Sequence, residues 1–222
     1  MPSATECTSP YTCLAADADG FIGHDNTSHA SVRNASTGTT ANSTLSQNVR
    51  AVMYMHAKGV YNITRTFIVF PTNGISTTVT AANLYIRGLT KNSGDVIAVK
   101  STWNGKSTLA TSNFDSLDFS TPYSSEVSTW LTSTSQNEIE LNAQARLDMQ
   151  NNDYISIALI NHTYDYSDTD GSGATEENGM YYTEQSGTSS DPELGYTIAA
   201  AATPITLSAG VVTLSSGLVT IT

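Results

Sequence analysis

Residues 164–177, YDYSDTDGSGATEE, are the part of this sequence whose side chains are best suited to chemistry. Carboxylate oxygens along one flexible loop are the ligands that Ca²⁺ prefers. Positions three, five, six and twelve of an EF-hand-like loop fall on Asp168, Asp170, Gly171 and Glu177, but Tyr166 replaces the acid expected at position one. The broken motif favours a solvated acidic surface loop over a Ca²⁺ site. A looser Ca²⁺ site would use Asp165, Asp168, Asp170 and Glu176 or Glu177.

Catalytic residue patterns are absent from the sequence. It contains no Gly-x-Ser-x-Gly, no His-Glu-x-x-His and no phosphate-binding Gly-rich loop. The histidines have no potential partner at a meaningful spacing in the sequence. They are His24, His29, His56 and His162. We therefore expect a protein that is not an enzyme and that carries no cofactor, apart from the Ca²⁺ alternative.

Cys7 and Cys13 are the only cysteines. If the chain turns at Ser9 and Pro10, their spacing allows a small disulfide loop that holds the N-terminal arm. Two free thiols in a protein made in reducing cytosol are an equally good interpretation. The sequence leaves both alternatives open.

Alternating apolar residues predict strands on both sides of residue 100. In residues 79–87, Ala82, Leu84 and Ile86 share one face, and residues 153–160 alternate in the same way. Residues 67–70 are apolar on both faces, as in a strand buried within a sandwich. Turn clusters separate these runs, and only residues 142–149 (NAQARLDM) indicate a helix. The predicted fold class is all-β, an antiparallel, jelly-roll-like β-sandwich.

The last 18 residues repeat with a period of seven, as ITLSAGV, VTLSSGL and VTIT. Val, Thr, Ser and Gly are poor helix formers, so the repeat predicts short strands that end in small-residue turns. We expect an assembly element that pairs with a neighbouring copy or with a shell protein, and the alternative is a tail folded onto its own sandwich. The expected interface residues are Ile205, Leu207, Val212, Leu214 and Val219.

Composition limits the partners and the location. Only 13% of the residues are charged, the net charge is −11, and Ser and Thr make up more than a quarter of the chain. A net negative charge disfavours nucleic acid and anionic membranes as partners. No apolar run is long enough to span a bilayer. Hydroxyl-rich chains suit the outside of cells or particles, and the first residues lack the pattern of a secretory signal. This combination favours a virion component.

Two segments resemble one known family. The first is TRTFIVF at residues 64–70, an Arg-led apolar strand. The second is YYTEQSGTSSDPELGYTI at residues 181–198, which contains the closing strand after Pro192. Together they resemble the DNRLRE-type carbohydrate-binding-like β-sandwich modules of bacterial surface proteins and bacteriophage tail and virion proteins. The resemblance covers residues 17–198. It implies a sandwich that binds glycans, but no binding residue is carried over from the family.

Glycan binding needs exposed aromatic platforms. Trp103 shares the alternation of the apolar strand before it and is expected in the core, whereas Trp130 lies in a Ser/Thr-rich stretch that favours exposure. The candidate glycan-binding residues are Trp130, Tyr164 and Tyr166.

The expected organisation is an N-terminal arm (1–16), a sandwich (17–198) and a C-terminal assembly tail (199–222). We predict a bacteriophage virion structural protein, displayed on the particle as a capsid decoration, spike or fibre-type appendage. Its expected partners are other virion proteins, further copies of itself, with a trimer among the expected states, and a host surface glycan. The alternative is a secreted or cell-surface carbohydrate-binding module.

Overall fold

The computed structural model describes residues 12–92, 95–132, 136–186 and 190–200. In this part of the chain strands predominate and the strand pairs are antiparallel, which confirms the predicted all-β class. The strands are β1 (Thr12–Ala15), β2 (Ala18–Asn26), β3 (Thr40–Asn42), β4 (Gln47–Ala57), β5 (Val60–Pro71), β6 (Val79–Asn92), β7 (Val96–Ser101), β8 (Leu117–Pro122), β9 (Gln136–Glu140), β10 (Tyr154–Asn161), β11 (Thr175–Tyr181) and β12 (Glu193–Ile198). The helical segments are α1 (His29–Arg33), a 3-10 turn (Thr111–Asn113), α2 (Ala143–Asn151) and a π turn (His162–Tyr166).

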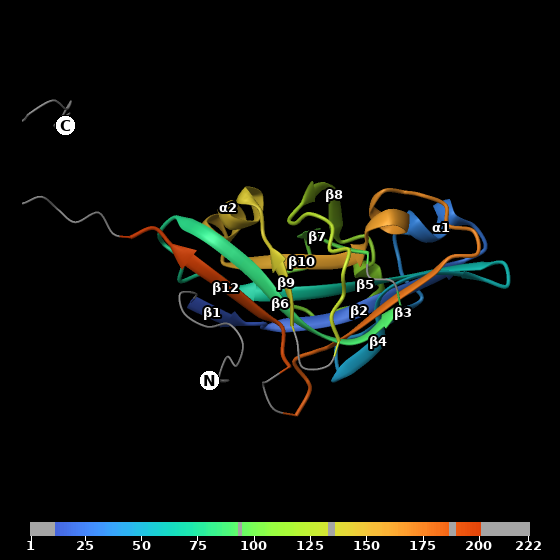
Figure 1. Cartoon of the computed structure of the whole chain (residues 1–222), viewed down its shortest axis with the longest axis horizontal. Helices are drawn as coiled ribbons and strands as arrows, with labels where there is room; N and C mark the ends of the chain where they lie inside the picture. The colour runs from blue at the N-terminus through green and yellow to red at the C-terminus, as the bar shows by residue number, and fades with distance from the viewer. Residues whose placement is uncertain (1–11, 93–94, 133–135, 187–189, 201–222) are drawn as a thin grey trace, which may run out of the picture.

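β5 is the central strand of the sheet (Figure 1). β2 pairs along one edge of β5, from Ala18 opposite Val69 to Asn26 opposite Tyr61. The other edge is shared by two strands, because β4 pairs with the first residues of β5 and β10 with the last. The sheet continues from β10 to β7 and β8, and from β4 to β11 and β6.

β6 changes partners along its length. Its first part pairs with β9 on one edge and with β12 on the other, since Asn83 lies opposite both Glu140 and Gly195. From Gly88 onward β6 pairs with β11 instead. β1 adds to the outer edge of β12. One strand therefore links the β1-β12-β6-β9 group to the sheet built around β5.

Two hydrophobic clusters cover opposite faces of the central strands. Ile68 and Phe70 of β5 point into the first cluster, which the β6, β9 and β12 side chains complete. Phe67 and Val69 point into the second, with residues of β4, β7 and the segment after β7. The prediction that residues 67–70 are buried on both faces is therefore confirmed.

The helix predicted at residues 142–149 is present as α2. It starts there because the Asn142 side chain accepts a hydrogen bond from Ala145 N at 3.1 Å and caps the first turn. α1 was not predicted. It is one turn of five residues, too short for a periodic apolar pattern to identify.

The N-terminal boundary of the sheet needs correction. β1 lies within residues 1–16, which the sequence assigned to an arm, yet it pairs with β12 from Thr12 opposite Tyr196 onward. Cys13 on β1 is disulfide-bonded, and Cys7, the other cysteine of the chain, lies outside the described residues. Ala199 donates its N–H to Thr78 O at 2.8 Å. The described helices include none that could cross a membrane.

Candidate functional site

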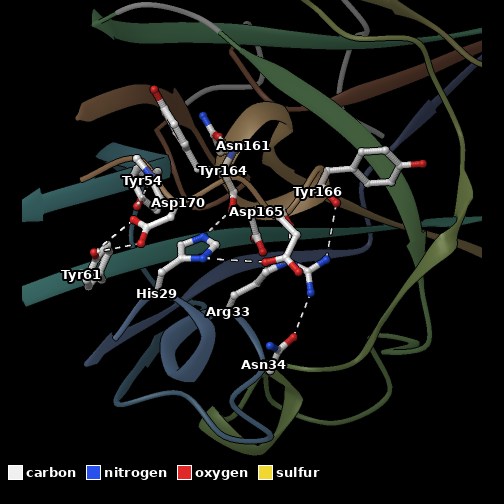
Figure 2. A network of polar contacts seen from close by, with 12 residues as sticks. His29, Arg33, Asn34, Tyr54, Tyr61, Asn161, Tyr164, Asp165, Tyr166 and Asp170 are labelled. Atoms are coloured by element: carbon white, nitrogen blue, oxygen red, sulfur yellow. Dashed lines mark hydrogen bonds and ion pairs between the residues drawn. The ribbon is translucent and has the colours of Figure 1, made fainter. Parts of the chain in front are cut away.

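The acidic loop singled out in the sequence begins with the π turn at the end of β10 (Figure 2). Asn161 caps the turn, because its Oδ1 accepts from Tyr164 N at 2.7 Å. The same side chain donates from Nδ2 to Glu176 Oε2 at 2.6 Å, which ties the turn to β11. Ser167 N then donates to His162 O at 2.8 Å and closes the wide turn. Asp168 follows with φ of 54°, a left-handed conformation that Asp tolerates better than most residues.

A buried ion pair holds the centre of this turn. Asp165 and Arg65 are both fully buried. Arg65 Nε and Nη2 donate to the two carboxylate oxygens of Asp165 at 2.8 and 2.7 Å, in the bidentate geometry that a planar guanidinium favours. Arg65 Nη1 donates to Phe114 O at 2.9 Å, and the guanidinium carbon lies 4.0 Å from the centroid of the Phe114 ring. The pair therefore fixes the turn against β5 and the segment before β8.

α1 packs its two basic side chains against the same turn (Figure 2). His29 Nε2 donates to Tyr164 O at 2.9 Å, and Arg33 Nε donates to Asp165 O at 2.7 Å. Both side chains also approach the half-exposed Asp168, at 3.7 Å from His29 Nδ1 and 3.4 Å from Arg33 Nε. Tertiary contacts of this kind explain why so short a helix forms at this place.

Tyrosines from β4 and β5 hold the other side of the loop. Tyr54 and Tyr164 stack with their centroids 4.3 Å apart, and Gly171 N donates to Tyr54 OH at 3.0 Å. Tyr61 OH donates to Asp170 Oδ1 at 3.0 Å. Burial raises the pKa of Tyr54 to about 12, and the nearby Asp170 carboxylate acts in the same direction. Tyr54 therefore stays a neutral acceptor at physiological pH.

The four acids of the predicted Ca²⁺ site do not converge in the structure. Asp165 faces Arg65, Asp170 faces Tyr61, and Glu177 is 2.8 Å from Arg50 Nε. The remaining acid, Asp168, faces α1. In the part of the chain that the structure describes, the metal-competent cluster lies elsewhere, at Asp95, Glu126 and His162. Glu176, the other acid of the Ca²⁺ alternative, accepts from Asn161 Nδ2, so each of these acids has its own protein partner.

The aromatic candidates divide into buried and partly exposed residues. Trp130 was expected at the surface, but it is 1% exposed and donates from Nε1 to Gly179 O at 3.1 Å. This is a correction, because Trp130 fills the first hydrophobic cluster. Trp103 is buried, as predicted. Tyr164 and Tyr166 are partly exposed and remain candidates for contact with a ligand.

Several residues of the site carried no recognisable signal in the sequence. Arg65 belongs to an apolar strand and is 100 residues from Asp165, so only the fold reveals its partner. His162 likewise lacks a partner nearby in sequence, and the structure places its ring near Asp95 and Glu126. The predicted assembly residues Ile205, Leu207, Val212, Leu214 and Val219 lie outside the described residues.

Comparison of the chain with protein-family models and with curated proteins found no match. Any inference about function must therefore rest on the fold and on the π turn. In that turn, the charged and aromatic side chains bond to one another and to the backbone of neighbouring elements. Such an arrangement makes a loop rigid and presents its outer rings, Tyr164 and Tyr166, in a fixed orientation.

Proposed function

We propose that this chain is a bacteriophage virion structural protein with a non-catalytic role. It would be displayed at the particle surface as a capsid decoration, spike or fibre-type appendage. The observation that carries the proposal is the internal bonding of the π turn. Arg65, Arg33 and His29 donate hydrogen bonds to carbonyl and carboxylate groups of the protein. Such a network makes a surface loop rigid, as a displayed structural protein requires.

The composition and the fold support the same role. An antiparallel sheet with a hydroxyl-rich, weakly charged chain suits a particle exterior. We propose that the two hydrophobic clusters mark the layers of a jelly-roll-like sandwich, and that residues 205–222 form a β-repeat tail through which copies assemble or dock on other virion proteins. A homo-oligomer, with a trimer among its possible states, would follow from such a tail.

A glycan-binding module is the second candidate, whether on a virion or as a secreted or cell-surface protein. It rests on Tyr164 and Tyr166, whose rings are partly exposed. The Tyr164 ring is fixed by stacking on Tyr54, and the Tyr166 ring lies parallel to His162 with centroids 5.8 Å apart. Fixed aromatic faces suit the apolar faces of sugars.

The location of the native protein tests the first candidate. Mass spectrometry of purified phage particles should detect the chain at a fixed copy number per particle. Particles that lack it, together with culture supernatant that contains it, would contradict the virion role and support the secreted module. A glycan array then tests binding directly, with Tyr166→Ala as the variant and Tyr154→Ala, a tyrosine outside the π turn, as the control.

A further inference from the structure

His162 lies close to two carboxylates that come from distant parts of the chain. Its Nδ1 is 3.5 Å from Asp95 Oδ1 and 3.5 Å from Glu126 Oε2. The three ligand atoms lie within 4.8 Å of one another. Asp95 immediately precedes β7, Glu126 belongs to the connection between β8 and β9, and His162 is the first residue of the π turn.

The separations match those of ligands around a shared metal ion. A length of 3.5 Å is long for a direct hydrogen bond between these atoms. Two ligands bound about 2.1 Å from one zinc ion in tetrahedral geometry lie roughly 3.4 Å apart. The oxygens of Asp95 and Glu126 therefore lie as far from His162 Nδ1 as two ligands of one zinc ion lie from each other.

Contacts other than those of the imidazole ring hold the three residues in place. Asp95 Oδ2 accepts from Thr163 N at 2.9 Å, and Asp95 O accepts from His162 N at 2.9 Å. Val96 and Val127, the residues next to Asp95 and Glu126, form an antiparallel bridge with N–O distances of 3.2 and 2.7 Å. Supporting hydrogen bonds of this kind orient the ligands of metal sites.

The charges of the cluster favour a cation. Within the described residues, the ion pairs of Asp95 and Glu126 are both with His162, so two negative groups face one imidazole. Glu126 also lines an open cavity of about 500 Å³ whose other walls include Ser124, Thr129 and Glu140. The side chains of Glu126 and His162 are 42% and 27% exposed, so water can reach them and complete the coordination of an ion.

From this geometry we propose that Asp95, Glu126 and His162 bind one divalent transition-metal ion of the zinc class. One imidazole nitrogen with two carboxylate oxygens is a donor set suited to zinc, whereas Ca²⁺ and Mg²⁺ prefer oxygen donors throughout. The ion would join the β6–β7 connection, the β8–β9 connection and the π turn. Binding to the folded state alone would also raise the stability of the fold.

Isothermal titration of the full-length chain with ZnCl₂ tests the proposal. The sample for this experiment should carry no polyhistidine tag and should be stripped of metal with EDTA. It should be kept under non-reducing conditions so that the disulfide of Cys13 stays intact. We expect one Zn²⁺ per chain and a rise in Tm on zinc addition. Asp95→Asn and Glu126→Gln should each weaken binding about tenfold or more. Glu140→Gln, which alters an exposed acid lining the same cavity, should bind zinc like the unmodified chain.

Co²⁺ provides a second readout, because its visible absorption reports its coordination. The unmodified chain and Glu140→Gln should show the absorption of bound Co²⁺, and Glu126→Gln should lose it. Circular dichroism of the metal-free variants checks that each is folded, and Glu126 is exposed enough for its substitution to leave the core untouched. The proposal is overturned by an absence of saturable zinc binding, by zinc affinity that neither substitution weakens, or by a preference for Ca²⁺ over Zn²⁺.

Discussion

Arg65 is the residue on which the geometry of the π turn depends. Its guanidinium joins Asp165 in the turn to the carbonyls of Phe114 and Arg33. Four hydrogen bonds from one buried cation satisfy most of its donors, and removal of the partner carboxylate would leave a buried charge without compensation.

Asp165→Asn should therefore destabilise the fold by about 3–5 kcal/mol. Asp168→Asn is the matched control, because Asp168 is 54% exposed and its ion pairs with His29 and Arg33 should contribute less than about 1 kcal/mol. Urea unfolding followed by circular dichroism gives both values. Equal effects of the two substitutions would mean that the buried pair has no special role.

Asp19 predicts an unusual dependence of stability on pH. It is 1% exposed, and its oxygens accept from Thr183 N and Thr183 Oγ1 at 3.0 and 3.2 Å. Burial raises the pKa of Asp19 to about 8, and the charge of Glu184 acts in the same direction. Between the unfolded pKa of 3.8 and a folded pKa of about 8, the folded state holds a proton that the unfolded state has lost. A rise in pH through this window therefore favours unfolding.

Asp19→Asn should remove this effect and keep an oxygen that accepts from Thr183 N. We expect the variant to melt at a higher temperature than the unmodified chain above pH 8, with a difference that shrinks steadily toward pH 4. Asp191→Asn is the comparison, since burial raises the pKa of Asp191 only to about 6. The gain in Tm from Asp191→Asn should therefore stop increasing above about pH 6. Melting curves at several pH values between 4 and 9 measure both. A pH-independent difference for Asp19→Asn would show that burial does not shift this carboxyl group.

The residues of the site were only partly predictable from sequence. The sequence singled out the acidic loop as chemically distinctive, but local spacing suggested a common ligand for acids that face Arg65, Tyr61 and Arg50. The position of Trp130 was misjudged for a similar reason. Its Ser/Thr-rich neighbours are poor guides to a ring whose Nε1 reaches Gly179, 49 residues away.

At the level of elements, Gly88 marks the point where β6 exchanges its partners. A Cβ atom at this position would lie 2.0 Å from Leu131 O and 2.8 Å from Trp130 Nε1. The segment that carries Trp130 therefore passes directly against the backbone of β6. Only a residue without a side chain allows so close an approach.

Gly88→Ala should thus displace this segment and destabilise the fold by about 1–3 kcal/mol. Gly74→Ala is the control, because nothing lies within 4 Å of a Cβ at Gly74, and its effect should stay within about 0.5 kcal/mol. Chemical denaturation compares the two, and tryptophan fluorescence of Gly88→Ala should report a more polar environment for Trp130. An unchanged spectrum together with unchanged stability would contradict this account.

The strands were the most predictable elements, because alternation or a continuous apolar run identifies a strand that faces a core. Ile155, Ile157 and Leu159 of β10 share one cluster, as their spacing predicts. The residues between them are buried too, because the second cluster covers the other face, and Ala158 belongs to it. Alternation cannot reveal a second covering layer, nor can it reveal α1 and the π turn, which depend on tertiary contacts.

At the level of the whole molecule, truncation tests whether the proposed assembly tail is needed for the sheet or only for assembly. A chain that ends at Thr203 should keep its β-sheet circular dichroism and its Tm, because β12, the last strand within the described residues, ends at Ile198. It should lose the oligomeric state proposed for the full chain, since burial of each apolar side chain of the repeat in an interface would contribute roughly 1.5–3 kcal/mol. Light scattering after size exclusion measures the state. A truncated chain that stays oligomeric but melts earlier would place the tail on its own sheet.

The pairing of β1 with β12 also has a consequence for biosynthesis. Thr12 lies opposite Tyr196, and β12 is the strand between β1 and β6. On a translating ribosome, β1 and one edge of β6 therefore wait unpaired until residue 198 has left the exit tunnel. Exposed strand edges invite pairing between neighbouring nascent chains. We infer that this protein is most vulnerable during its own translation, so a low rate of initiation, which leaves fewer nascent chains side by side, should favour a soluble product.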